Sequence, residues 1–143
     1  MPFRKLAITV ASIFIFAVSS VATFASGLIS AQEAYAKSKA KEIVLIDIRS
    51  PAEWKESGIA ETAIAISMHE KGFLEGLEKV RKENPNKEIA LICATGGRTH
   101  FVQNELKKRN LGSVIDVSEG MFGNKRGSGW IAQQLPIKKW SGQ

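Results

Sequence analysis

The stretch EIALICATGGRT, residues 88–99, decides the fold of this chain. Its first half, from Glu88 to Cys93, is almost continuously apolar, which is typical of a strand buried on both faces in a parallel sheet. Apolar residues then recur at helical spacing and predict a helix over residues 99–109. A buried strand that leads at once into a helix indicates an α/β domain, because the helix packs back onto the sheet.

The segments on either side repeat this alternation. Ser30, followed three residues later by Glu33, is a capping box that marks the start of the first helix. We expect strands at residues 43–48, 63–67, 88–93 and 113–117, and helices at 30–40, 51–57, 71–83, 99–109 and 129–135. The predicted fold is therefore a small three-layer α/β domain in which helices flank a mainly parallel central sheet.

Length and composition limit what the domain can be. The chain has 143 residues, 44% of them apolar and 24% charged, which suits one soluble domain that we place at residues 26–143. The net charge of +6 comes from scattered basic residues without the aromatic interleaving of a nucleic-acid surface, so we expect no nucleic-acid partner. One cysteine excludes an internal disulfide and a multi-thiolate metal site. His69 and His100 lack metal-ligand spacing, and we expect no metal.

Residues 1–25 have the layout of a targeting segment. Arg4 and Lys5 precede an uncharged run from Leu6 to Ile29, as a positive region precedes the apolar core of a signal peptide. Small residues suit cleavage after residue 22 or 25, whereas a cut after residue 36 would remove half of the first helix. The run is also long enough for an uncleaved membrane anchor. Either interpretation predicts a domain outside the cytoplasm: periplasmic, secreted, or anchored to the membrane and facing outward.

The chemistry is expected in the loop that follows the strand. Cys93 ends that strand, at the sheet edge where helix N-termini present unpaired N–H groups. Gly96 and Gly97 allow positive φ angles, so that successive amides can form an anion-binding nest that favours the thiolate form of the cysteine. The same amides would hold an anionic sulfur donor, and Arg98 could add charge or brace the loop. The opposing interpretation is a buried, inert structural thiol.

Three motifs in order resemble the rhodanese family of sulfurtransferases. They are CATGGRT at residues 93–99, LIDIR with PAEW at residues 45–54, and VSEGMFG with GW and LP at residues 117–136. The resemblance implies a persulfide enzyme with Cys93 as its catalytic residue and without a metal or organic cofactor. It would move sulfane sulfur from thiosulfate or a thiol-bound donor to cyanide or another thiol. The implied substrate-binding residues are Ala94, Thr95, Gly96, Gly97, Arg98 and Thr99.

Loop length and loop composition refine this expectation. Only four residues separate Cys93 from Arg98, whereas related cysteine-dependent phosphatases have a longer loop, so a phosphatase is disfavoured. Ala94 is uncharged where thiosulfate-preferring relatives often have a basic residue, which favours a persulfide or thiol-bound donor. Residues 56–63 also lack the His-x-Pro-Gly turn common in the family.

Several roles stay open at the level of sequence. The alternative to an enzyme is a persulfide carrier or sensing module with little turnover of its own, which could act on a partner protein. Met121 and Phe122 could line the pocket beside the cysteine or form a core wedge. Asp47 and Arg49 are expected to be a structural pair near the site. A membrane is expected as a partner only if residues 1–25 are not cleaved.

Overall fold

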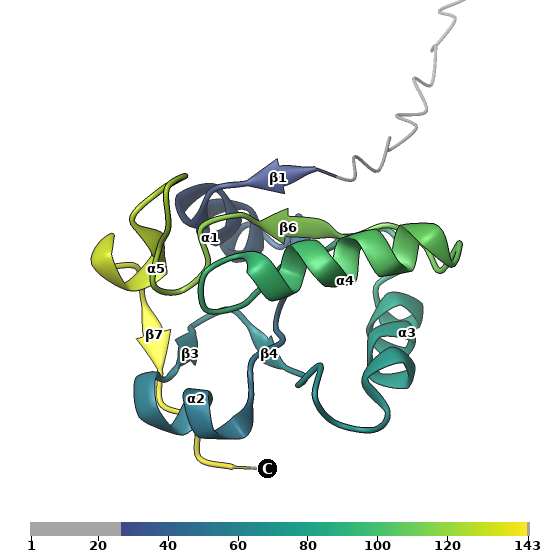
Figure 1. Ribbon diagram of the computed structural model, residues 1–143, viewed down its shortest axis with the longest axis horizontal. Coiled ribbons are helices and arrows are strands. Elements are labelled where there is room, and N and C mark those ends of the chain that lie inside the picture. The colour runs from purple at the N-terminus through teal and green to yellow at the C-terminus, as the bar shows by residue number, and fades with distance from the viewer. Residues whose placement is uncertain (1–26, 143) are drawn as a thin grey trace, which may run out of the picture.

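The computed structural model describes residues 27–142 and contains a five-stranded parallel sheet (Figure 1). The strand order is β1-β6-β5-β2-β4, and every pair in it is parallel. The bounds are β1 Leu28–Ile29, β2 Ile43–Asp47, β4 Ile64–Ala65, β5 Glu88–Ile92 and β6 Ile115–Val117. The short strands β3 (Ile59–Ala60) and β7 (Ile137–Lys138) form a separate antiparallel pair.

Helices cover both faces of the sheet. One core joins α1 (Ala31–Lys39) and α5 (Gly129–Ala132) to one face, and the other joins α3 (Phe73–Glu83) and α4 (Gly97–Lys108) to the opposite face. Figure 1 shows α4 in front of β6 and α1 behind it. The short helix α2 (Pro51–Ser57) follows β2. The expected three-layer α/β fold with a parallel central sheet is confirmed.

Most of the expected elements are present, with shifted ends. The helix expected at residues 51–57 has those bounds, and Ser30 caps α1 by accepting a hydrogen bond from the Glu33 N–H. The helix expected from residue 99 begins earlier, at Gly97, so that Thr99 lies in its first turn. Strands β1, β3 and β7 have two residues each and were not expected; β1 exists through its pairing with β6, and β3 and β7 exist through their pairing with each other.

The targeting segment expected at residues 1–25 lies outside the described residues. Within residues 27–142, no helix combines the length and the apolar character needed to cross a membrane.

Candidate functional site

Cys93 is the first residue after β5, at the carboxyl edge of the sheet. Its side chain is 1% exposed and belongs to the apolar core beneath α3 and α4. Because Ile92 is in register with Asp47, the end of β2 lies beside it, and the residues that follow both strands meet at this edge. The thiol is thus at the position where open parallel sheets bind ligands.

Among the described residues, the sulfur of Cys93 has two hydrogen-bonding neighbours. The Gly96 N–H donates a hydrogen bond to Sγ at 3.2 Å, and the Thr99 hydroxyl oxygen lies 3.7 Å from it. Gly96 precedes α4 with a φ of 86°, and this left-handed conformation turns its amide back toward the sulfur. Among residues 27–142, the N–H groups of Ala94 and Thr95 have no hydrogen-bond acceptor.

The two glycines of the loop differ. Gly96 has the expected positive φ, but Gly97 does not, because it is already the first residue of α4. A Cβ on Gly96 would overlap the Ser118 carbonyl oxygen, whereas a Cβ on Gly97 would meet nothing within 4 Å. The expected nest therefore has only one glycine in the left-handed region.

The segment after β6 holds one side of the loop. The Met121 and Phe122 N–H groups donate to the carbonyl oxygens of Cys93 and Ala94, both at 2.9 Å. The Asn124 amide donates to the Thr95 carbonyl oxygen at 2.6 Å. These contacts fix the first three residues of the loop from outside, so that their carbonyl groups face away from the sulfur.

Arg98 holds the other side of the loop. Its guanidinium donates two hydrogen bonds to the Glu53 carboxylate, at 2.8 and 2.6 Å. Glu53 also completes the capping box of α2 with Ser50. The hydrogen bonds from Arg98 are the largest cause that lowers the pKa of Glu53, to about 2, and the same contact raises the pKa of Arg98. In this structure Arg98 braces the loop against α2.

Asp47 and Arg49 form the expected structural pair. Both side chains are fully buried, and the Arg49 guanidinium donates to the Asp47 carboxylate at 2.8 Å. Arg49 also donates to the Gly58 carbonyl oxygen, and the Trp54 indole N–H donates to Asp47. The hydrogen-bonding groups of this pair are thus engaged by each other and by neighbouring protein groups. Such an arrangement suits a structural role in holding the turn after β2.

Thr99 connects the sulfur to a buried acid. Its hydroxyl donates to the Asp116 carboxylate at 2.5 Å and also lies 3.0 Å from the Gly96 carbonyl oxygen. Asp116 is fully buried in β6, and burial is the main cause that raises its pKa. Asp116 was not among the expected site residues. Its signal was a carboxylate inside the otherwise apolar run of residues 114–117.

The remaining candidates separate clearly. Met121 is fully buried and belongs to the core, whereas Phe122 is 52% exposed, with the Arg49 guanidinium carbon 5.9 Å from its ring centre. His69 lies 3.4 Å from the Arg98 guanidinium.

Glu53 and Asn124, which hold the loop, were also not expected. Within residues 27–142, no cluster of three or more His, Cys, Asp or Glu side chains is arranged to hold a metal ion.

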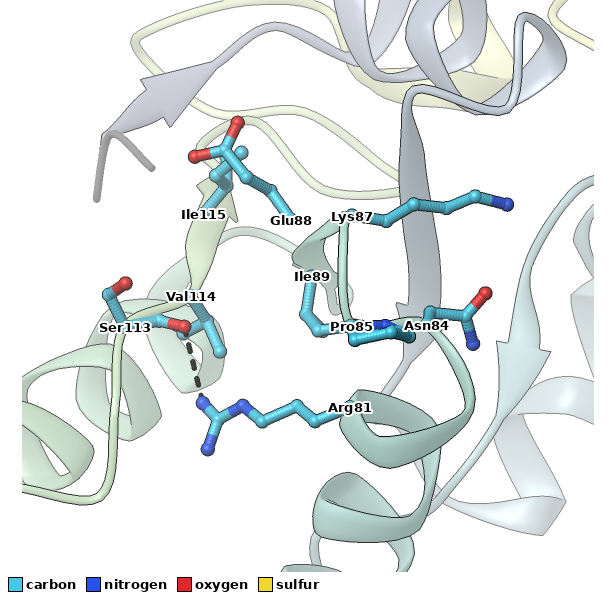
Figure 2. Close-up of a pocket in the computed structure, with 9 residues that line it drawn as sticks. All are labelled: Arg81, Asn84, Pro85, Lys87, Glu88, Ile89, Ser113, Val114 and Ile115. Atoms are coloured by element: carbon cyan, nitrogen blue, oxygen red, sulfur yellow. Dashed lines mark hydrogen bonds between the residues drawn. The ribbon is translucent and has the colours of Figure 1, made fainter. Parts of the chain in front are cut away.

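A pocket of about 230 Å³ lies at the opposite edge of the sheet (Figure 2). It is formed around the starts of β5 and β6 and the end of α3. Arg81 reaches across it and donates to the carbonyl oxygens of Leu111 and Ser113, while it pairs with Glu78. These contacts join α3 to the segment before β6, and none of the residues that line the pocket belongs to the loop around Cys93.

Solved structures similar to this chain include two bacterial proteins, and one relative matches it in sequence. A polysulfide-sulfur transferase homodimer from Wolinella succinogenes is 25% identical, with a TM-score of 0.57 over 80% of this chain and 79% of that one. A protein of unknown function from Rhodopseudomonas palustris, named as a possible tyrosine phosphatase, is 23% identical, with a TM-score of 0.60 over 78% of this chain and 84% of that one. An uncharacterized protein of Rickettsia prowazekii is 26% identical over 98 residues, which are 64% of this chain and 80% of the relative.

The sequence profile of the rhodanese-like domain matches residues 30–126. This range begins at the cap of α1 and includes the whole loop around Cys93 and the segment that holds it. The chain therefore belongs to the rhodanese-like domain family.

Proposed function

We propose that this chain is a sulfurtransferase that carries sulfane sulfur as a persulfide on Cys93. Membership of the rhodanese-like family and the similarity to a polysulfide-sulfur transferase support sulfur transfer as the class of reaction. The observation that carries the proposal is the hydrogen bond from the Gly96 N–H to the Cys93 sulfur at 3.2 Å. An amide that points at the sulfur from a helix N-terminus favours the negative charge that a nucleophile needs.

The proposed reaction has two displacement steps. In the first, the Cys93 thiolate attacks the outer sulfur of the donor; the new S–S bond forms as the donor's own bond to that sulfur breaks. With thiosulfate the leaving group is sulfite, and with a persulfide it is a thiolate. In the second, the acceptor attacks the outer sulfur of the enzyme persulfide. Cyanide then leaves as thiocyanate, and the Cys93 thiolate is restored.

The loop residues have distinct roles in this proposal. The N–H groups of Ala94 and Thr95, which have no acceptor among residues 27–142, would bind the anionic end of the donor. Arg98 acts mainly as a brace, because its guanidinium is engaged by Glu53. Ala94 brings no charge, so we expect a persulfide or thiol-bound donor to work better than thiosulfate. The four-residue spacing to Arg98 disfavours a phosphatase.

Thiocyanate formation tests the proposal directly. The purified protein is supplied with cyanide and, in separate reactions, thiosulfate, inorganic polysulfide or glutathione persulfide. We expect turnover with at least one donor, greater for polysulfide or persulfide than for thiosulfate, and loss of turnover to background in Cys93→Ser. Equal rates for the two proteins would refute a catalytic role for Cys93.

A persulfide carrier is the second candidate, and the burial of Cys93 favours it. A side chain that is 1% exposed gives an acceptor in solution little access to the outer sulfur, so a partner protein would have to collect it. Mass spectrometry of the protein after incubation with polysulfide separates the two candidates. A stable gain of one sulfur atom at Cys93, with thiocyanate formation at background, identifies a carrier. A thiol that takes up no sulfur excludes both.

We further propose that residues 1–25 direct the domain out of the cytoplasm. Their sequence, a basic start and a long uncharged run, supports export. Expression of the full chain with fractionation of the cells, followed by determination of the mature N-terminus, tests this. A new N-terminus near residue 23 or 26 in the exported fraction indicates cleavage, and an intact N-terminus in the membrane fraction indicates an anchor. An intact chain in the cytoplasm refutes export.

A further inference from the structure

Asp116 is a buried carboxylate without a full set of partners. Its side chain is fully buried, and one oxygen, Oδ1, accepts a hydrogen bond from Thr99. The other oxygen, Oδ2, has no hydrogen-bond donor, and among the described residues it is the one buried side-chain oxygen or nitrogen in this state. A buried carboxylate with one free oxygen is costly when it is ionised and unpaired, so its position calls for a reason beyond packing.

The charges around Asp116 do not compensate it. From α4, the His100 Nδ1 lies 3.8 Å from Oδ2, beyond hydrogen-bond distance, and half of that side chain is exposed. From the loop after β6, Arg126 acts on Asp116 only through its charge. Burial raises the pKa of Asp116. It outweighs the Thr99 hydrogen bond and the charges of His100 and Arg126, all of which lower that pKa. The free-energy difference between the protonated and the ionised forms of Asp116 therefore favours the protonated form more than it would in water.

The Thr99 hydroxyl stands between this acid and the sulfur. Its oxygen is 2.5 Å from Asp116 Oδ1 and 3.7 Å from Cys93 Sγ. A hydroxyl has one proton to donate and two lone pairs to accept with. When the proton points to an ionised Asp116, a lone pair is left for the thiol S–H. When Asp116 is protonated and donates to Thr99, the hydroxyl proton turns to its two other neighbours, the Gly96 carbonyl oxygen at 3.0 Å and the sulfur at 3.7 Å, and a negative charge on the sulfur draws it to the sulfur.

We propose that Asp116 is a positioning residue that exchanges one proton with Cys93 through the Thr99 hydroxyl. In this exchange the thiol passes its proton to the Thr99 oxygen, and Thr99 passes its own hydroxyl proton to Asp116 Oδ1. The products are a thiolate, an unchanged threonine and a neutral carboxylic acid. One negative charge stays in the network throughout, so the thiolate forms without a second buried charge beside it.

The inference rests on the proposed function only in taking Cys93 as the reactive group. Its tests measure protonation and not sulfur transfer. A failure of thiocyanate formation with an intact proton exchange would therefore refute the proposed function alone, and the reverse result would refute this inference alone.

Thiolate absorbance at 240 nm gives the first test, because Cys93 is the only cysteine of the chain. The absorbance of wild type is followed against pH, with Cys93→Ser subtracted to remove the ionisation of other groups. We expect Asp116→Asn, which cannot take the proton or carry the charge, to form thiolate at a midpoint at least one pH unit lower. An unchanged or raised midpoint in a folded Asp116→Asn protein overturns the inference.

Substitutions at Thr99 test the route of the coupling. Thr99→Ser retains the hydroxyl, and we expect the effect of Asp116→Asn to persist in it. Thr99→Val removes the hydroxyl at nearly constant shape, and there we expect that effect to fall to half or less. An equal effect in the valine background means that the two groups interact only through space and overturns the exchange. Loss of the effect in His100→Gln would assign the coupling to the imidazole and would also overturn it.

A second measurement does not depend on the folding of an Asp116 variant. The carboxyl carbon of Asp116 is followed by nuclear magnetic resonance against pH in wild type and in Cys93→Ser. We expect the wild-type signal to change in two phases, the later one together with thiolate formation, and the serine variant to show a single phase. Identical curves in the two proteins overturn the inference.

Discussion

At the scale of single residues, the adjacent glycines Gly96 and Gly97 differ in whether their positions require a glycine. Gly96 needs its φ of 86° to direct its N–H at the sulfur, and it lies against the Ser118 carbonyl oxygen. Gly97 has ordinary helical geometry at the start of α4 and open space around it. The sequence shows the pair as equivalent, and only the packing of the segment after β6 distinguishes them.

Alanine at each glycine gives a matched pair of variants. We expect Gly96→Ala to lose about 2 kcal/mol or more of unfolding free energy and most of its sulfur transfer, because the side chain is strained and collides with Ser118. Gly97→Ala should fold with wild-type stability within about 0.5 kcal/mol. Urea unfolding and thiocyanate formation measure both effects. Equal tolerance of the two substitutions would contradict the geometry of the loop.

The contact between Glu53 and Arg98 has a defined pH dependence. The pKa of Glu53 is lowered from 4.5 to about 2 in the folded protein, so the unfolded chain binds more protons in that interval. The stabilisation is therefore complete above the unfolded value and is lost as the pH falls through the folded one. It is fully present at neutral pH.

The variant Glu53→Gln tests this dependence. We expect it to be less stable than wild type by about 1 kcal/mol at pH 7, with a difference that shrinks as the pH falls from 4.5 toward 2. Urea unfolding across this range measures the difference. Glu56→Gln, an exposed carboxylate on the same helix, is the control and should change little. A difference that grows with acid would contradict the assigned sign.

Some of the site residues could be predicted from sequence, and others could not. The loop around Cys93 was predictable, because its cysteine, glycines and arginine are contiguous and their order alone indicates an anion-binding loop beside a thiol. Glu53, Asp116 and Asn124 were not, because each reaches the loop from a distant part of the chain through the fold. Asp116 had a visible anomaly, a carboxylate in a buried strand, but sequence does not say which hydroxyl it meets.

At the scale of elements, Glu119 connects two helices on one face of the sheet. Its carboxylate accepts the Ala31 N–H at the start of α1 and the Gly129 N–H at the start of α5. It also accepts from the Gln133 amide. Burial opposes the ionisation of Glu119, but these three hydrogen bonds together outweigh it and lower its pKa. One side chain thus satisfies amides that neither helix could pair internally.

Removal of this carboxylate should loosen both helices together. We expect Glu119→Ala to cost about 2–4 kcal/mol, because it leaves buried N–H groups without acceptors, and Glu119→Gln to cost less because one acceptor oxygen remains. Unfolding free energies and hydrogen exchange of the Ala31 and Gly129 amides measure this. Faster exchange at only one of the two amides would contradict a shared anchor.

The elements themselves followed from sequence to the extent that their patterns are local. The apolar runs of β2 and β5 and the capped helices α1 and α2 were predicted because propensity, caps and periodicity agree over five or more residues. β1 was hidden in the uncharged run that continues from residues 6–25, the expected targeting segment. Its two residues become a strand only because the backbone of β6 lies beside them.

At the scale of the whole molecule, the residues just before and within α1 complete the fold. β1 extends the sheet at its edge, where the Asp116 N–H donates to the Gly27 carbonyl oxygen. Ala31 and Ala34 are fully buried in the core between α1 and the sheet. These contacts make Gly27, Ala31 and Ala34 part of the folded domain, and we predict that a cut after residue 36 would open this core from one side.

Shortened chains test this prediction. A chain that begins at Ser26 retains β1, Ala31 and Ala34, and we expect its thermal unfolding to be cooperative. A chain that begins at Lys37 lacks them all and leaves Glu119 buried without its Ala31 partner, so its unfolding midpoint should be lower by about 10 °C or more, or its transition lost. Calorimetry compares the two chains directly. Equal midpoints would mean that the core closes without α1, and a mature N-terminus after residue 36 would then become compatible with a folded domain.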